Sequence, residues 1–195
     1  MAGKLVLVIG GARSGKSSFA EKYVLNYGSK CAYIATAEIL DEEMAERVKQ
    51  HQLRRNGKRW VNFEAPYNAD NTVAQAGEAA DCILFDCLTL YLSNLMYGKN
   101  APDTFEEKCL YVRNEVDKLL QAAKKTNKTV VFVSNDVGCG IVPDNQMARE
   151  YRDVAGWLTQ QVGFEADFVF YVMAGQAVDI KKLAFKFENN PTLGE

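Results

Sequence analysis

Short apolar runs alternate along the chain with longer segments that mix apolar and polar residues. The first run, Lys4–Ile9, is continuous rather than alternating, which is typical of a parallel strand covered on both faces. Gly10 interrupts this run, and residues 16–27 then follow a helical pattern that Gly28 ends. The beginning of the chain is therefore predicted to form a strand, a glycine loop and a helix.

The same order recurs through most of the chain. Further strands are expected over residues 31–35, 60–64, 82–85, 129–133 and 167–173, and we expect the last of these to be the final strand. Helices are expected over residues 41–55, 71–80, 88–97, 105–125 and 146–162. Strands that alternate with helices predict an α/β fold in which a mostly parallel central sheet lies between two layers of helices.

Length and composition limit the remaining alternatives. The 195 residues suit one domain, predicted to span residues 1–195, with a flexible tail over residues 184–195. The formal net charge of −2 argues against a nucleic-acid partner, and no run of about 18 apolar residues predicts a membrane span. The five cysteines form no CxxC pair, which favours small buried residues in a reducing cytoplasm over a disulfide or zinc framework.

The glycine loop matches the phosphate-loop pattern GxxxxGK[ST] in full. Its glycines allow the backbone N–H groups to point inward, and the helix that follows adds a partial positive charge. We expect Lys16 to act in catalysis by reaching the β- and γ-phosphates of a nucleoside triphosphate. The predicted nucleotide-binding residues of the loop are Gly10, Gly11, Ala12, Arg13, Ser14, Gly15, Lys16 and Ser17. The alternative is a glycine turn that binds nothing. The motif and its strand–helix context favour a P-loop NTPase fold of the RecA-like type.

A magnesium ion is expected to accompany the nucleotide. The Ser17 hydroxyl is one predicted metal ligand. The second is an acid at the end of another core strand, and Asp86 follows the apolar run over residues 82–85. The alternative for Asp86 is an acidic residue that merely ends its strand.

His51 is the only histidine and falls late in the predicted helix over residues 41–55. Met44, Val48 and His51 share one helical face, which favours a histidine packed against the core. A neutral imidazole can also attack phosphorus near neutral pH, and arginines that suit phosphate oxygens lie close to it in the sequence. Both interpretations of His51 stay open on this evidence.

Five motifs in order resemble those of a known family. They are residues 10–17, Tyr33–Thr36, Asp41–Ala45 leading to His51, Asn135–Pro143, and Arg152–Gly156. Over residues 5–182 the chain resembles the bifunctional adenosylcobinamide kinase / adenosylcobinamide-phosphate guanylyltransferase family of cobalamin biosynthesis. The resemblance implies that ATP or GTP first phosphorylates adenosylcobinamide. GMP then passes from GTP, through a guanylylated histidine, to the new phosphate to give adenosylcobinamide-GDP.

The resemblance also implies roles for particular residues. The guanylylated histidine corresponds to His51, and members of the family form homotrimers. Nucleotide contacts are implied for the phosphate loop and for Thr36, Ala37, Glu38, Arg54, Arg55, Glu64 and Asp86. Asn135–Pro143 follows a core strand and is expected to shape the site or a subunit contact, with a glycine-rich connector as the alternative. The residues that bind the corrinoid, the exact role of this loop and the role of Arg152–Asp153 are not indicated.

Two other function classes remain as alternatives. A different small-molecule P-loop kinase would need Lys16 and Asp86 but not His51. A GTP-dependent switch would normally read guanine with an N-K-x-D loop, and Asn127–Val130 lacks the acid. Labelling with α-labelled GTP separates the bifunctional enzyme from the simple kinase. Slow GTP hydrolysis without a corrinoid acceptor, stimulated by a protein partner, would instead favour the switch.

Overall fold

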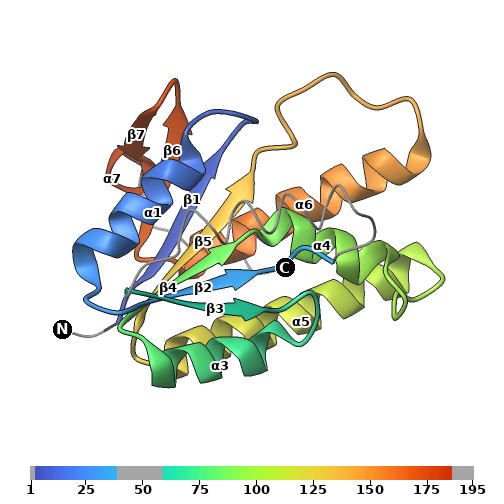
Figure 1. Cartoon of the computed structure of the whole chain (residues 1–195). Helices are drawn as coiled ribbons and strands as arrows, with labels where there is room; N and C mark the ends of the chain where they lie inside the picture. Colours follow the sequence, from blue (N-terminus) through green and yellow to red (C-terminus); the bar gives the residue numbers. More distant parts are fainter. Residues whose placement is uncertain (1–2, 39–58, 186–195) are drawn as a thin grey trace.

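The computed structural model describes residues 3–38 and 59–185, which form one α/β unit around a seven-stranded sheet (Figure 1). The strands lie in the order β3-β2-β4-β5-β1-β6-β7. Their bounds are β1 (Leu5–Gly10), β2 (Cys31–Ala35), β3 (Trp60–Glu64), β4 (Cys82–Asp86), β5 (Thr129–Asn135), β6 (Phe168–Met173) and β7 (Gln176–Asp179). Strands β1 to β6 are parallel and β7 runs antiparallel to β6.

Helices cover both faces of this sheet (Figure 1). Helix α1 (Lys16–Tyr27) packs on one face. The other face carries α3 (Ala69–Ala79), α4 (Leu88–Tyr97), α5 (Phe105–Lys125) and α6 (Gln146–Glu165). A short helix, α7 (Ile180–Leu183), lies beside β6. The three layers confirm the predicted α/β sandwich of the P-loop type.

The continuous apolar run at the start of the chain is explained by burial on both faces. Val6 and Val8 of β1 pack into the core under α1, while Leu5 and Leu7 pack into the core under the other four helices. All four side chains are buried. A strand whose side chains point alternately into two apolar layers needs no polar position, so the periodicity of two is lost from the sequence.

The strand order gathers the predicted site at one edge of the sheet. In parallel strands the carboxyl ends meet at the same edge, which is where open α/β sheets bind ligands. The segments that follow β1, β2, β3, β4 and β5 therefore all emerge there. Because β5 lies between β1 and β4, its carboxyl end separates the phosphate loop from Asp86.

The prediction that residues 167–173 form the final strand is wrong. The chain reverses at Ala174 and Gly175, both with positive φ (50° and 76°), and continues into β7. A two-residue reversal of this kind usually carries Asn-Gly or Asp-Gly, and β7 has only four residues. Neither signal was strong enough in the sequence to predict a hairpin.

Most other predicted bounds agree with the structure to within a few residues. Helix α3 begins at Ala69 rather than residue 71, and α6 continues to Glu165 rather than residue 162. The predicted helix over residues 41–55 and most of the predicted tail over residues 184–195 lie outside the described residues.

The cysteines are as expected, because all five are free thiols and three of them, Cys31, Cys82 and Cys87, are buried. Within residues 3–38 and 59–185, none of the helices has the length and apolar character needed to cross a membrane.

Candidate nucleotide-binding site

The phosphate loop curls between the end of β1 and the start of α1. Arg13 and Gly15 adopt left-handed conformations, with φ of 55° and 97°. The Lys16 side chain is buried, and its Nζ atom donates a hydrogen bond to the Gly11 carbonyl oxygen at 3.1 Å. The lysine therefore folds back over its own loop, which keeps the ammonium group beside the backbone that would surround phosphates.

Two glycines of the loop are required by their surroundings. A Cβ atom at Gly10 would lie 2.4 Å from the Val172 carbonyl oxygen, closer than real Cβ atoms approach. At Gly15 a Cβ atom would lie 3.1 Å from the Cα atom of Gly175, in a backbone conformation that L side chains rarely adopt. The glycines of the motif thus also serve the packing of the loop against the β6–β7 hairpin.

Two backbone hydrogen bonds tie the loop to neighbouring elements. The Asp136 N–H group, just after β5, donates to the Gly10 carbonyl oxygen at 3.0 Å. The Gly175 N–H group, in the hairpin turn, donates to the Ser14 carbonyl oxygen at 2.9 Å. The loop is therefore held from both sides in the curled shape that phosphate binding needs.

Several donors of the loop are left for a ligand. No side chain caps the N-terminus of α1, whose N-cap residue is Gly15, and its first turn carries no acidic residue. The Ser14 hydroxyl oxygen is buried and has no hydrogen-bond partner among the residues described. Unpaired N–H groups at a helix N-terminus attract anions, so this end of α1 suits a phosphate group.

Two carboxylates lie at the same edge on the face that α1 covers. Ala35 pairs with Glu64 of β3 on one side and with Asp86 of β4 on the other. Asp86 alternates with Phe85, so it shares the face of Cys82 and Leu84, which pack under α1. The Tyr33 hydroxyl donates to Asp86 Oδ2 at 3.3 Å. Lys16, Ser17, Glu64 and Asp86 therefore occupy one side of the sheet edge.

Thr36 is held inside the protein at the end of β2. Its hydroxyl donates to the Cys87 carbonyl oxygen and accepts from the Cys87 N–H group, both at 2.8 Å. Its own N–H group donates to the Asp86 carbonyl oxygen at 3.3 Å. The side chain is fully buried, so the hydroxyl fixes the backbone that follows Asp86.

Glu38 lies at the end of the described segment and is held by a tyrosine. The Tyr67 hydroxyl donates to Glu38 Oε2 at 2.8 Å. Burial and this hydrogen bond to the carboxylate raise the pKa of Tyr67. Nearby, Asn94 of α4 donates through Nδ2 to the carbonyl oxygens of Thr36 (2.7 Å) and Pro66 (3.0 Å). Together these contacts connect the segments that follow β2 and β3.

Sequence reasoning missed Tyr67 and Asn94 as supports of the site. Asn94 had a usable signal, because it is the one amide in a mostly apolar helix, Leu88–Tyr97. Such an amide must find partners when it is partly buried. Tyr67 had no such signal in the sequence, because its partner Glu38 follows a different strand and lies far from it along the chain.

The structure brings most of the predicted site residues together at the carboxyl edge. They are Gly10, Gly11, Ala12, Arg13, Ser14, Gly15, Lys16, Ser17, Thr36, Ala37, Glu38, Glu64 and Asp86. The predicted residues His51, Arg54 and Arg55 lie outside the described residues.

The oxygen groups at this edge fit a magnesium ion of the kind that nucleotides carry. Ser17 offers a hydroxyl and Asp86 a partly exposed carboxylate, which are ligands that Mg²⁺ accepts. Within the described residues no three His, Cys, Asp or Glu side chains cluster as a metal site. An ion here would therefore take most of its ligands from water and from phosphate oxygens.

The chain is similar to known proteins over most of its length. The family model for cobinamide kinase / cobinamide phosphate guanyltransferase matches residues 6–180. The chain is 37% identical over 182 residues to the bifunctional adenosylcobalamin biosynthesis protein CobU of Salmonella typhimurium, covering 91% of this chain and 99% of the relative. It is 36% identical to the protein of the same name from Escherichia coli, with the same coverage.

Among solved structures, a KaiC-like protein from Pyrococcus horikoshii aligns with a TM-score of 0.49 and 16% identity, covering 87% of this chain and 71% of that one. The family model spans nearly all of the chain, from β1 to the start of α7, and thus includes the phosphate loop, both carboxylates and the loop after β5. The chain therefore belongs to the cobinamide kinase / cobinamide phosphate guanyltransferase family.

Proposed function

We propose that this protein is a bifunctional enzyme of cobalamin biosynthesis. It phosphorylates adenosylcobinamide with ATP or GTP and then transfers GMP from GTP to the product, which gives adenosylcobinamide-GDP. The observation that carries the proposal is a complete phosphate loop, with its buried Lys16, on the same side of the sheet edge as Asp86. The family match over residues 6–180 supports the two substrates.

In the first reaction the loop and Lys16 bind the triphosphate. The acceptor hydroxyl oxygen attacks the γ-phosphorus, the bond to the β-phosphate oxygen breaks, and the hydroxyl proton is released. Negative charge that develops on the phosphate oxygens is stabilised by the Lys16 ammonium group and by the N–H groups at the start of α1. Because two backbone bonds hold the loop before substrate arrives, little reorganisation is needed during the reaction.

In the second reaction a histidine divides one displacement into two. The His51 imidazole attacks the α-phosphorus of GTP and pyrophosphate leaves. An oxygen of the acceptor phosphate then attacks the same phosphorus, and the phosphorus–nitrogen bond breaks to restore the imidazole. Arg54 and Arg55 are proposed to pair with phosphate oxygens in these steps. The family membership supports these roles.

Mg²⁺ is proposed to be held by Ser17 and Asp86 together with phosphate oxygens and water, and it would neutralise charge on the nucleotide. Thr36 supports this arrangement by fixing the backbone next to Asp86.

Incubation with α-labelled GTP tests the second activity directly. The protein should acquire an acid-labile, base-stable phosphoramidate label, and the variant His51→Asn should not. Adenosylcobinamide phosphate should then discharge the label, and mass spectrometry should identify adenosylcobinamide-GDP. Phosphorylation of adenosylcobinamide without any label on the protein would instead identify a simple P-loop kinase.

The assembly and the cellular location are further parts of the proposal. We propose a homotrimer, which light scattering on the purified protein would test. Exposed apolar side chains on α5 and α6 (Leu110, Trp157 and Phe164), beside a hollow of about 1180 Å³, are a surface that a neighbouring copy could cover. The five free thiols support a reducing cytoplasm.

A further inference from the structure

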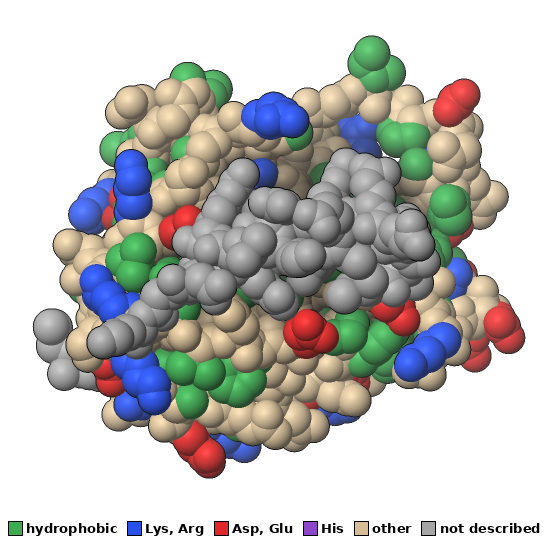
Figure 2. Space-filling model, in the orientation of Figure 1, with side chains coloured by type: hydrophobic (Ala, Val, Ile, Leu, Met, Phe, Trp, Pro, Cys, Tyr) green, Lys and Arg blue, Asp and Glu red, His purple; other side chains and the backbone are tan. Residues whose placement is uncertain are grey.

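The loop from Asp136 to Pro143 begins directly beside the phosphate loop and then leaves the body of the protein. Asp136 contacts Gly10 through its backbone N–H group, and the loop then arches over to α6 (Figure 1). Ile141 is 98% exposed and Val142 is 64% exposed. Figure 2 shows hydrophobic side chains on the upper rim of the same view. The loop therefore projects from the carboxyl edge of the sheet, where β5 ends, and exposes apolar side chains there.

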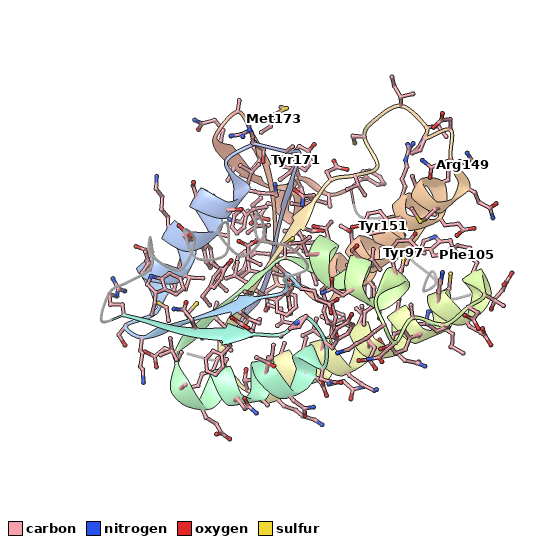
Figure 3. All side chains as sticks on the ribbon, turned by 45° about the vertical axis from the view of Figure 1, so that its right-hand side comes forward. Tyr97, Phe105, Arg149, Tyr151, Tyr171 and Met173 are labelled. Carbon is pink, nitrogen blue, oxygen red and sulfur yellow. The ribbon has the colours of Figure 1, made fainter. Side chains whose placement is uncertain are left out.

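Two arginines of α6 hold this loop, but they use their nitrogens differently. Arg149, in the first turn of the helix (Figure 3), donates through Nη1 to the carbonyl oxygens of Pro143 (2.9 Å) and Asp144 (2.7 Å). Arg152 donates through Nη2 to the Gly138 carbonyl oxygen at 2.6 Å. Its other terminal nitrogen, Nη1, is buried and has no hydrogen-bond partner in the part of the chain that the structure describes.

A guanidinium nitrogen that is buried without a hydrogen-bond partner costs free energy, so its presence in a folded protein calls for an explanation. No carboxylate among the described residues lies within ion-pairing distance of Arg152. A guanidinium with one nitrogen anchored to a backbone carbonyl and the other without a partner keeps the capacity to pair with an anion, which the loop around the enclosed Nη1 atom must move to admit.

The carboxylate of Asp136, at the start of the same loop, has other partners. It accepts hydrogen bonds from the Tyr171 hydroxyl (3.2 Å) and the Gly138 N–H group (3.3 Å). The Cys139 thiol also bonds to Asp136, and these interactions raise the pKa of both Tyr171 and Cys139. Arg152 is not among these donors, so Asp136 forms no direct ion pair with its guanidinium.

The position of Arg152 indicates which phosphate it would meet. Tyr171 pairs with Ile9, which packs in the core under α3 to α6, so the cluster around Asp136 lies on that side of the edge. Lys16 and Asp86 belong to the side that α1 covers. The cation of Arg152 therefore stands across the sheet edge from the nucleotide-binding lysine, where a second phosphate-bearing molecule would approach.

We propose that Arg152 binds the phosphate of the corrinoid acceptor during guanylyl transfer, with the Gly138 carbonyl oxygen holding its guanidinium in place. This inference rests on the proposed function, since only the second reaction brings an acceptor that already carries a phosphate. It also gives a specific role to the two motifs, Asn135–Pro143 and Arg152–Gly156, whose exact roles the sequence left open.

The variant Arg152→Gln tests the proposal, with Arg149→Gln as a matched control on the same helix and loop. Loss of a charge-assisted hydrogen bond predicts a rise of roughly 10- to 100-fold in the KM for adenosylcobinamide phosphate with Arg152→Gln. The KM for GTP and the extent of protein labelling by α-labelled GTP should stay within about twofold of the parent protein, as expected if nucleotide contacts are intact. Arg149→Gln should change neither.

A binding measurement complements the kinetics. Equilibrium dialysis of adenosylcobinamide phosphate without nucleotide, followed by the absorbance of the corrinoid, should show the same weakening for Arg152→Gln. Arg152→Lys should recover part of the affinity, because lysine restores the positive charge but not the planar pair of donors that a guanidinium offers. Thermal unfolding of each variant identifies any that fail to fold, and in that case Arg152→Lys carries the test.

Three outcomes would overturn the proposal. One is an unchanged KM for the acceptor phosphate in Arg152→Gln. Another is an equal rise in Arg149→Gln, which would show that bracing of the loop is the whole effect. The third is a larger rise in the KM for GTP than for the acceptor. Failure of the parent protein to become labelled by GTP would instead reject the proposed function itself.

Discussion

At the scale of single residues, the site depends on groups whose neighbours fix their size or their hydrogen-bond partners. Gly10 faces the carbonyl oxygen of Val172, and Lys16 folds onto Gly11. Thr36 uses both hydrogen-bonding capacities of its hydroxyl on Cys87. Of these, the sequence motif identified the first two, whereas the true contacts of Thr36 depend on a distant strand and could not be read from its neighbours.

Gly10→Ala should weaken nucleotide binding by distorting the loop. The new methyl group would lie 2.4 Å from the Val172 carbonyl oxygen, so either the hairpin or the loop must move. Overpacking of this kind costs about 1–3 kcal/mol. Titration with a fluorescent GTP analogue should show a Kd raised at least roughly tenfold, which corresponds to about 1.4 kcal/mol. In the control Gly11→Ala no atom lies within 4 Å of the new methyl group, so its melting temperature should be that of the parent protein.

Thr36→Val should destabilise the fold, whereas Thr36→Ser should not do so to the same extent. Valine leaves the buried N–H and C=O groups of Cys87 without their side-chain partner, at a cost of about 1–3 kcal/mol. Urea unfolding of the three proteins measures this difference. Equal stability of the valine and parent proteins would show that the threonine acts only on the nucleotide.

At the scale of elements, local signals located most helices and strands, while their pairing came from long-range packing. Helix α5 begins as its sequence indicates, because Thr104 and Glu107 form a capping box. Gly28 and Gly98 follow the ends of α1 and α4. The hairpin to β7 was missed because Ala174 adopts a left-handed conformation without the usual Asn or Asp. The order of the strands, which places β5 between β1 and β4, has no signature in the local pattern.

The amino ends of β1 and β6 are joined by one carboxylate, which predicts a dependence on pH. Asp167 accepts hydrogen bonds from the Leu5 N–H group (2.9 Å) and Lys4 Nζ (3.0 Å). Burial alone would raise its pKa, but these donors outweigh burial and the pKa is lowered. A lowered pKa means stability that is present above the unfolded-state value of about 3.9 and is lost as the pH falls through the lower folded-state value.

Asp167→Asn should therefore reduce stability at pH 7 and flatten the loss of stability below about pH 4. Urea midpoints measured from pH 3 to pH 7 check both effects. A variant that loses stability by the same amount at every pH would show that Asp167 acts by packing rather than by its charge.

At the scale of the whole molecule, burial decides which thiols solvent can reach. Cys139 is the exposed cysteine, Cys109 is partly buried, and the other three are buried. The native protein should therefore present one fast-reacting thiol to a disulfide reagent, and the denatured protein five. Because the hydrogen bond to Asp136 raises the pKa of Cys139, its reaction should quicken as the pH rises above neutrality.

The variant Cys139→Ser should abolish that fast phase. If more than one thiol reacts rapidly in the native protein, the layers on the two faces of the sheet open more readily than their burial implies.

The bond from Gly175 to Ser14 joins the last hairpin of the described chain to its first loop. During synthesis on the ribosome, the glycine-rich motif emerges long before the hairpin after β6 that braces it. A nascent chain that ends before β6 would have the motif with only one of its two braces, the bond from Asp136. Nucleotide is thus unable to act as an early template for folding, and a truncated translation product should neither sequester GTP nor consume it.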